Sequence, residues 1–373
     1  MFTGAPSSAV NLGTNTGPNA LLVSASYPLP STAGHGPLTT VPLPGGFTYW
    51  RIDTGTSGQF TMPNLWGSPT QPYVYNNTSS NLGGIIPAGG LTIDGYAYPA
   101  GTYVFQFMDF SQGIGATGTG YIDAVSAPAA GVSVLFRGCR FRGGAENGYL
   151  NVNATYTTGL YYHYCDLGAV NSAAANESGI AIDMSGAGSA FRAYRCYISY
   201  PTSGIFANIG GSGACDVIEN FIEKLSLSNL SAHLNGISLN GGNLNASILR
   251  NHIVIVTPDE QGNTIDQTDC IAFFQDFGTF PGSGHNTDGT KGYWVNDNYC
   301  GGTGYCFYFG QNPATNPNTV NNMNAGGNLL TTSVYSTGGS NGAAAAIPSW
   351  GSFGNSETAN TWADGANKGQ SWL

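Results

Sequence analysis

Short apolar segments recur along the middle of the chain with a nearly constant arrangement of hydrophobic and polar positions. In each one, a mostly apolar residue lies three positions before a marked position, and another apolar residue lies two positions after it. The marked positions are Met108, Cys139, Cys165, Cys196, Asn220, Asn251 and Asn298. A unit of this kind, repeated at similar spacing, is typical of a solenoid whose coils bury their apolar faces against one another.

A second kind of segment lies between these and alternates apolar with other residues. GIAIDM at 179–184 and GISLNG at 236–241 are examples, and such alternation is typical of half-buried β-strands. No amphipathic helix separates the strands, so helical repeats do not fit. The pattern predicts an all-β fold, a right-handed parallel β-helix solenoid, whose coils stack about 4.8 Å apart.

Stacked coils place equivalent residues on top of each other, which gives the marked positions a structural meaning. We expect Cys139, Cys165 and Cys196 to form a column of small buried side chains rather than reactive thiols. Below them, Asn220 and the later marked asparagines are expected to form a ladder in which each amide bonds the next.

The ends of the chain lack the repeat and divide it into three parts. Residues 1–85 are rich in Pro, Gly, Ser and Thr and predict an attachment or cap segment; residues 86–311 predict the β-helix; residues 312–373 look loop-like and predict a second cap or oligomer contact. Both segments are therefore expected to be non-repeating caps, because the open ends of a β-helix expose unpaired strand edges.

Composition and charge narrow the class of protein. Charged residues make up 8%, hydrophobic residues 41%, and 56 residues are Gly, which favours an all-β chain with many turns and argues against disorder. The net charge is −10, and the only basic patch is RGCRFR at 137–142, so we expect no nucleic-acid partner. No apolar run is long enough to span a membrane, and MFTGAPSSAV at 1–10 does not read as a secretory signal peptide. Seven cysteines without a CxxC pair predict neither a disulfide framework nor a zinc site.

Three segments resemble a known superfamily. QTDCIAF at 267–273, VNDNYCGG at 295–302 and NTWADG at 360–365, together with the coil pattern, resemble the pectate-lyase-like right-handed β-helix superfamily, most of all the minor tail and tail-spike proteins of bacteriophages. The resemblance implies a virion tail component that forms a homo-oligomer, expected to be a trimer. It implies other phage tail proteins and host surface glycans as partners.

The enzymatic branch of that superfamily fits less well. Its pectin-hydrolysing members carry an Asn-Thr-Asp motif followed by an Asp pair before Cys-Ile-Ala, and then Gly-His-Gly and Arg-Ile-Lys. Here TDCIA stands at 268–272 and NTDG at 286–289, in the inverse order, and the two later motifs are absent. The hydrolase site is therefore not carried over.

Acidic residues nevertheless gather near the two largest insertions. The weak catalytic candidates are Asp266, Asp269, Asp276, Asp288 and His285, with Asp259 and Glu260 beside them. Two facing carboxylates would suit glycoside hydrolysis, loop oxygens would suit Ca²⁺, and solvated loop acids need neither. We expect no cofactor, with Ca²⁺ as the alternative.

Aromatic and basic residues near the marked positions are weak ligand-binding candidates. They are Tyr162, Tyr194, Tyr197, Arg137, Arg195 and Arg250. Outward rings would stack on sugars or lie between subunits, and the arginines would bind a ligand or form ordinary surface pairs with Glu219 and Glu223.

The sequence as a whole favours a phage tail appendage that contacts the host envelope or its glycans. A polysaccharide-degrading β-helix enzyme, lyase or glycoside hydrolase, and a purely structural tail component are the alternatives. The expected location is the virion, or else the extracellular space.

Overall fold

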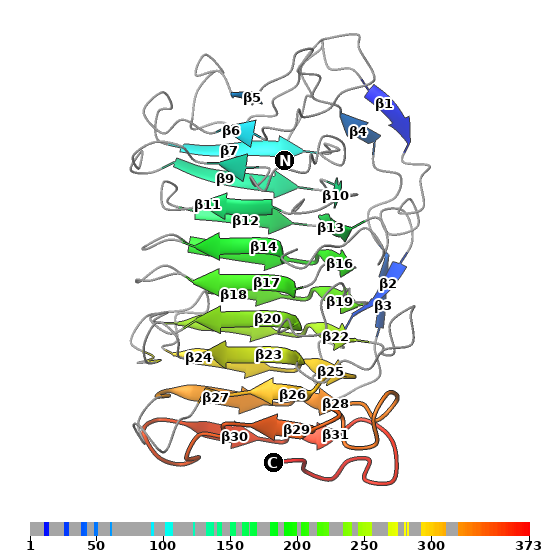
Figure 1. Ribbon diagram of the computed structural model, residues 1–373, viewed down its shortest axis with the longest axis vertical. Helices are drawn as coiled ribbons and strands as arrows, with labels where there is room; N and C mark the ends of the chain where they lie inside the picture. The colour runs from blue at the N-terminus through cyan, green and yellow to red at the C-terminus, as the bar shows by residue number, and fades with distance from the viewer. Residues whose placement is uncertain are drawn as a thin grey trace.

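Parallel strands stack in three long sheets around one core in the computed structural model of the chain (Figure 1). The structure describes residues 11–14, 26–29, 39–42, 48–50, 60–61, 91–92, 101–106, 122–123, 132–137, 140–143, 150–153, 159–163, 165–169, 180–185, 190–199, 203–208, 215–223, 234–240, 245–255, 268–274, 280, 282, 292–310 and 320–373. Within these ranges every strand of the three sheets pairs in parallel with its neighbours, and no helix is present. Nowhere in them is there a helix long and apolar enough to cross a membrane.

Each coil contributes one strand to each sheet. In the described residues a nine-stranded sheet contains β7 (Gly101–Gln106), β9 (Val132–Arg137), β12 (Gly159–His163), β15 (Ala190–Tyr194), β18 (Cys215–Ile218), β21 (Ala246–Leu249), β24 (Tyr293–Asn296), β27 (Met323–Gly326) and β30 (Ser356–Thr358). An eight-stranded sheet, again counted over the described ranges, contains β10 (Arg140–Gly143), β13 (Asp166–Ala169), β16 (Tyr197–Ser199), β19 (Phe221–Glu223), β22 (His252–Val254), β25 (Tyr299–Gly301), β28 (Leu329–Leu330) and β31 (Thr361–Trp362).

The third sheet completes each coil. It has ten strands where the chain is described: β5 (Phe60–Thr61), β6 (Leu91–Thr92), β8 (Ile122–Asp123), β11 (Leu150–Asn153), β14 (Ile180–Ser185), β17 (Ser203–Asn208), β20 (Leu234–Asn240), β23 (Thr268–Phe274), β26 (Tyr305–Tyr308) and β29 (Gly342–Ala345). From β9 to β31 the chain visits the three sheets in the same order, which makes the fold a parallel β-helix. Two small antiparallel pairs lie outside it: β1 (Asn11–Thr14) with β4 (Thr48–Trp50), and β2 (Ser26–Leu29) with β3 (Thr39–Pro42).

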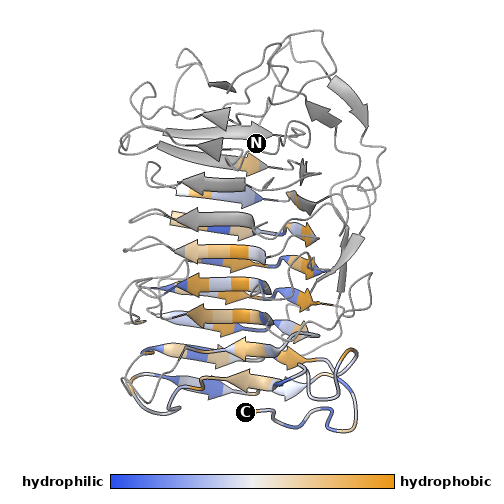
Figure 2. Cartoon of the chain, viewed as in Figure 1, coloured by the Kyte–Doolittle hydropathy of each residue, from blue (hydrophilic) through white to orange (hydrophobic). Residues whose placement is uncertain are grey.

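The core fills the space inside the three sheets. Alternate residues of β15 and β24 are buried and half-buried, as expected for strands with one face inside. Hydrophobic positions recur at the same place on successive strands (Figure 2). A row of Ile198, Ile222 and Ile253 runs down the eight-stranded sheet with no exposed surface.

An amide ladder lines the turn between the nine-stranded and eight-stranded sheets, which we call the first corner. The Nδ2 group of Asn220 donates to Oδ1 of Asn251 at 3.0 Å, and Asn251 donates in the same way to Asn298 at 2.9 Å. Asn298 then bonds Asn328 at 2.9 Å, and Asn328 bonds Asn360 at 2.8 Å. All five amides are almost fully buried. The hydrogen bonds between coils compensate for the hydration that these polar groups lose on folding.

The last two rungs show that the predicted C-terminal segment was drawn too long. Residues 312–373 were expected to leave the repeat, but β27 pairs in register with β24, and β30 with β27. The same holds for β28 and β31. The spacing of 30 and 32 residues between these rungs is similar to that in the earlier coils. The strands were not predicted because small residues such as Ala325 and Gly326 contribute little to a hydrophobic pattern.

A cap does exist, but it is formed by Trp350 and the last dozen residues. After β31 the chain folds back so that Thr361 and Ser371 form an antiparallel bridge. The ring of Trp372 stacks on Phe307 with centroids 5.0 Å apart, and Trp350 meets Phe309 edge-on at 5.5 Å. These indoles cover the open end of the core, which is the task expected of a solenoid cap.

At the other end, the predicted boundary at residue 85 also differs from the structure. The short strand β5, at Phe60–Thr61, already pairs in parallel with β6 of the ten-stranded sheet. Two residues carry too little hydrophobic pattern to reveal such a strand in the sequence.

Candidate functional site

Two columns of outward side chains run side by side on the nine-stranded sheet. Strand register places equivalent residues directly above one another. One column reads Tyr161, Arg192, Asp216, Ser247 and Trp294, and the other reads His163, Tyr194, Ile218 and Leu249. Polar and aromatic residues are therefore concentrated on the coils formed by β12, β15 and β18.

Three rings form the aromatic part of this surface. His163 lies between its two neighbours, with its ring centroid 6.5 Å from Tyr161 and 5.6 Å from Tyr194. The His163 and Tyr194 rings meet edge to face at 76°. All three side chains are half-buried, so part of each ring remains accessible on the outside.

An ion pair lies directly beside the rings. Arg192 donates from Nε and Nη2 to Oδ2 of Asp216, at 3.1 and 2.9 Å. The Asp216 side chain is only 2% exposed, whereas that of Arg192 is 35% exposed. The carboxylate therefore anchors a guanidinium whose outer part faces solvent.

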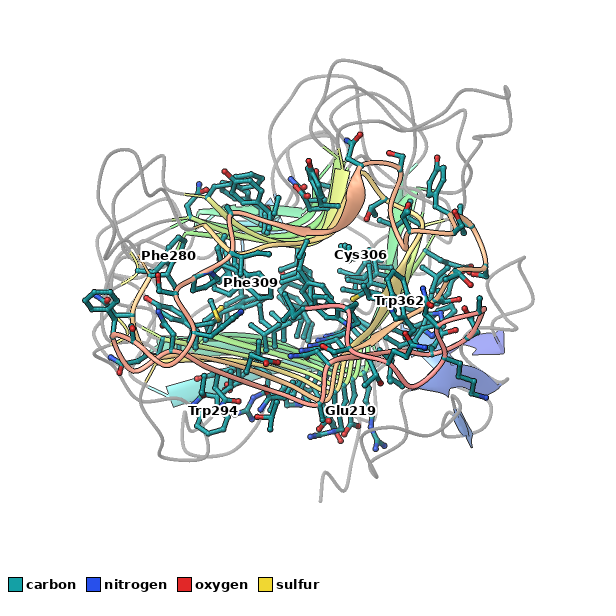
Figure 3. All side chains as sticks on the ribbon, turned by 90° about the horizontal axis from the view of Figure 1, so that it is seen from below. Glu219, Phe280, Trp294, Cys306, Phe309 and Trp362 are labelled. Atoms are coloured by element: carbon teal, nitrogen blue, oxygen red, sulfur yellow. The ribbon has the colours of Figure 1, made fainter. Side chains whose placement is uncertain are left out.

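A second ionic column follows the first corner. Glu219 Oε2 accepts from Nε of Arg195 at 2.6 Å, and its Oε1 accepts from Nε of Arg250 at 2.9 Å. Burial alone would raise the pKa of Glu219, but the hydrogen bonds and charges of both arginines outweigh it and hold the pKa below its ordinary value. Figure 3, which looks along the solenoid, shows Glu219 and Trp294 pointing outward on the same side, away from the core residues Phe309 and Cys306.

The backbone of this corner fixes where the charges point. Residues immediately before the ladder position adopt the left-handed conformation in successive coils; they are Arg195, Glu219, Arg250, Asp297, Gly327 and Ala359, with φ of 53°, 57°, 54°, 59°, 66° and 54°. Such φ values are unfavourable for residues with a Cβ, so the ladder behind and the ion pairs in front help to hold the turn. We call the combined surface of Tyr161, His163, Arg192, Tyr194, Arg195, Asp216, Glu219 and Arg250 the polar face.

The polar face contains several residues that the sequence singled out. Tyr194, Arg195 and Arg250 lie on it, and the Arg195 guanidinium lies 5.2 Å from the Tyr194 ring centroid. Arg137 shares the column of His163 by strand register. Arg195 and Arg250 also form surface pairs with Glu219, one of the two roles that the sequence left open.

His163, Arg192 and Asp216 were not predicted from the sequence as part of this surface. A usable signal was present, because the outward residues of the nine-stranded sheet stand two and four positions before each marked position. Counting back from Cys196 gives Tyr194 and Arg192, and alternation along a strand puts both on one face.

Tyr162 was wrongly predicted as a ligand-binding residue. Its side chain has no exposed surface and stacks on Phe136 in the core, with ring centroids 5.3 Å apart. It stands three positions before a marked position, which is the inward phase of the strand.

Tyr197 is also poorly placed for a ligand. It is 7% exposed, its hydroxyl donates to Glu223, and its ring stacks on Phe221 at 5.6 Å. The stack continues through His252 to Tyr299 on the outer side of the eight-stranded sheet. Strand β2 lies against β19 on this side (Figure 1).

Among the acidic candidates, Asp269 is the one that the structure describes. Asp269 is the second residue of β23 and is 7% exposed. Its backbone N–H donates to Oδ1 of Asn235 at 3.2 Å. Burial, and to a lesser extent the charge of Cys270, raises its pKa to about 7. The nearby acid in sequence, Asp297, lies at the first corner, whereas Asp269 lies in the ten-stranded sheet.

The remaining acidic candidates cannot be compared with Asp269. Asp259, Glu260, Asp266, Asp276, His285 and Asp288 lie outside the described residues. In the ranges that are described, no group of three or more His, Cys, Asp or Glu side chains is placed to bind a metal ion.

The six cysteines that the structure describes are buried. Cys165 and Cys196 are buried free thiols in the column that continues as the amide ladder, while Cys139 lies outside the described residues. The Sγ of Cys196 contacts the carbonyl oxygens of Tyr162 and Tyr194 at 3.5 and 3.6 Å.

No family model, no curated protein and no solved structure matches the chain.

Proposed function

We propose that the protein is an elongated, non-enzymatic binding solenoid that contacts glycans of a host cell envelope through the polar face. The observation that carries the proposal is the row of half-buried rings, Tyr161, His163 and Tyr194, beside the Arg192–Asp216 ion pair. Sugar rings present apolar C–H faces that stack on aromatic side chains, and their hydroxyl groups accept and donate hydrogen bonds that fixed charged groups satisfy.

The biological setting follows from the resemblance to bacteriophage tail proteins. We propose that the chain is a tail appendage, that it assembles as a homotrimer with other tail proteins, and that its coil is right-handed, as β-strand crossovers are in nearly all proteins. Support for the setting comes from the resemblance of the sequence segments, and support for an appendage comes from the long, regular rod of stacked coils.

Binding to purified envelope polysaccharides tests the proposal. We expect wild-type protein to bind, and Tyr194→Ala to weaken binding about tenfold by removing a stacking ring. Tyr308→Ala is the matched control, because Tyr308 is also half-buried and pairs with Phe274, but on the ten-stranded sheet. Equal losses in the two variants, or no binding to any envelope polysaccharide, would overturn the assignment to the polar face.

Oligomeric state gives a separate check. In a trimer, the polar face lies either between subunits or on the outside, where it can bind glycans. If the face lies between subunits, Tyr194→Ala dissociates the trimer in light-scattering measurements. We expect instead that the mass in solution stays unchanged and that glycan binding alone is lost.

Glycan cleavage is the second candidate, favoured by Asp269. A buried carboxyl with a pKa near 7 has the protonation behaviour of a general acid. New reducing ends from envelope polysaccharide, lost in Asp269→Asn, would support cleavage, and their absence in the wild type would exclude it for that polysaccharide.

A further inference from the structure

Three thiols meet in the core at the turn between the eight-stranded and ten-stranded sheets, which we call the second corner. Cys270 lies on β23, Cys300 on β25 and Cys306 on β26, and none of the three side chains has exposed surface. The thiol of Cys270 hydrogen-bonds those of Cys300 and Cys306. Its Sγ also lies 3.5 Å from Oγ1 of Thr303. The proposed function uses none of these groups.

We propose that Cys270 and Cys300 form a disulfide bond that joins two successive coils when the protein meets an oxidant during folding or local unfolding. The structure contains both residues as free thiols, and they stand thirty residues apart in the sequence. The sequence alone predicted no disulfide framework, because only the stacking of coils brings this pair together. The inference is independent of the proposed glycan binding.

The coils above show the separation that is available to such a bond. Gly236 stands above Cys270 in the ten-stranded sheet, and Ile253 stands above Cys300 in the eight-stranded sheet. A Cβ atom placed on Gly236 would lie 2.7 Å from Cγ2 of Ile253, and one coil higher the equivalent distance from Gly204 is 3.3 Å. Each glycine faces the isoleucine of the following coil, as Cys270 faces Cys300.

These distances match the geometry of a disulfide. Cγ2 of an isoleucine is bonded to Cβ in the same way as Sγ of a cysteine. In a disulfide the Cβ atom of one cysteine lies about 3 Å from the Sγ atom of the other, because the S–S bond is about 2.05 Å long. The backbone of the second corner therefore places Cys270 and Cys300 at bonding separation without a shift of either strand.

Cys306 is less well placed for the same bond, although it stands directly below Cys270 in the ten-stranded sheet. Equivalent residues on neighbouring parallel strands are about 4.8 Å apart, and their Cβ atoms point in the same direction. A disulfide brings its two Cβ atoms to about 3.8 Å, so a bond to Cys306 would pull the two strands together. Cys306 therefore provides the internal comparison for Cys300.

The reaction needs an oxidant, which an organic disulfide such as glutathione disulfide supplies. One cysteine thiolate attacks the organic disulfide, which forms a mixed disulfide and releases one thiolate. The second cysteine thiolate then attacks the sulfur of the first cysteine, which forms the Cys270–Cys300 bond and releases the second thiolate. The two released thiolates take up the protons that the cysteines lost. Two cysteines are thus oxidised while one organic disulfide is reduced to two thiols.

Burial limits when the bond forms. It raises the pKa of Cys300, and the thiolate is the reactive form of a cysteine, so the closed core resists oxidation. The bond therefore forms while the second corner is open, either during folding or in a local unfolding event. Once formed, it lies inside the core and is protected from reductants.

Oxidation of the purified full chain tests the pairing. Reduced protein is incubated with glutathione disulfide in urea just below the unfolding midpoint, returned to buffer, and then denatured with iodoacetamide to block the remaining thiols. We expect the number of free thiols to fall by two from seven, and peptide mapping by mass spectrometry to link Cys270 with Cys300. We also expect the oxidised protein to unfold about 5 °C above the reduced protein.

Two variants separate the possible partners of Cys270. Cys300→Ala should abolish the loss of thiols, whereas Cys306→Ala should leave it unchanged. Both substitutions remove a buried thiol from the same corner, so a general loss of stability affects both variants. If Cys300→Ala does not fold, the peptide map of the wild type still identifies the pair.

The outcomes are decided by the thiol count and the map. Seven thiols after oxidation, or a map that links Cys270 to Cys306, overturns the proposal. A mixture in which other cysteines pair at random also overturns it, because the geometry of the second corner favours one pair. None of these results affects the proposed glycan binding, which is measured separately with envelope polysaccharides.

Discussion

The inner column of the first corner is built from thiols in its upper part and from amides in its lower part, although the backbone is the same in both. Cys165 and Cys196 contact carbonyl oxygens at 3.5 Å or more through Sγ. Asn220 instead donates from Nδ2 to Ala193 O and to Asn251 Oδ1, at 2.9 and 3.0 Å. Both side chains are small enough for the corner, but only the amide has two strong donors and an oxygen that accepts twice.

The difference shows how the side chains of one coil form hydrogen bonds with the next coil. Cys196 and Asn220 meet at the border, where the Cys196 N–H donates to Asn220 Oδ1 at 2.9 Å. Above this border, the Sγ atoms of Cys165 and Cys196 contact main-chain carbonyl oxygens of the preceding coil, Phe136 O and Tyr162 O, each at 3.5 Å. Below it, the side chains add a continuous hydrogen-bonded row in which each rung satisfies the one before.

Breaking the amide row in its middle should give the largest effect. Asn298→Ala removes the acceptor of both the N–H and the Nδ2 of Asn251, which lie 3.0 and 2.9 Å from its Oδ1. Buried donors left without partners make this variant less stable by about 4 kcal/mol, as measured by urea unfolding at equilibrium. The matched change Cys196→Ala should cost about 1 kcal/mol; equal losses would refute the distinction between the two halves.

Moving the border by one coil should give intermediate effects of opposite sign. Asn220→Cys removes one rung and is expected to lower the free energy of unfolding by about 2 kcal/mol, since Asn251 then loses a donor. Cys196→Asn adds a rung whose Nδ2 can reach Asn220 Oδ1 and is expected to be neutral or stabilising by about 1 kcal/mol. Destabilisation by both changes would mean that each half is adapted to its own side chain.

The outer column of the same corner should respond to pH, unlike the neutral ladder behind it. The pKa of Glu219 is lowered from 4.5 in the folded protein, so its stabilisation is fully present above pH 4.5 and is lost as the pH falls through the lower folded value. We expect Glu219→Gln to cost about 1 kcal/mol at pH 7 and progressively less as the pH falls below 4.5. A constant difference across this range, measured by urea unfolding, would contradict the ionic role.

The smallest effect concerns the thiols themselves. Six of the seven cysteines are buried and free, and burial raises the pKa of Cys300 and Cys306. Native protein should therefore release no more than one equivalent of thionitrobenzoate from Ellman's reagent, and seven after denaturation. Rapid reaction of two or more thiols in the native state would contradict the burial of these six side chains.

Much of the fold was present in the sequence because the ladder residue recurs with fixed apolar neighbours. Asn220, Asn251 and Asn298 stand at equivalent places for that reason, and Asn328, with Ala325 before it and Leu330 after it, satisfies the same rule. The hydrophobic pattern around Asn328 is nevertheless weak, because the residues before it are rich in Asn and Gly. These residue types are typical of loops.

The candidate site was harder to predict because it depends on the phase of each strand. Tyr162 and Tyr161 are adjacent in sequence, yet one is in the core and the other on the polar face. Alternation decides between them only after the inward position is known. The contact of Arg195 and Arg250 through Glu219 depends in addition on stacking across 24 and 31 residues, which no local pattern contains.

The amide ladder also gives the solenoid an electrical direction. Every rung donates toward the C-terminal end, so the side-chain dipoles add head to tail over five coils and leave an N–H pointing out of the last one. That final group, Nδ2 of Asn360, lies 3.3 Å from the Glu357 carboxylate. A negative charge thus lies at the positive end of the row, as acidic residues lie at the first turn of an α-helix. The last amide of the row therefore has its hydrogen-bond partner within the same coil.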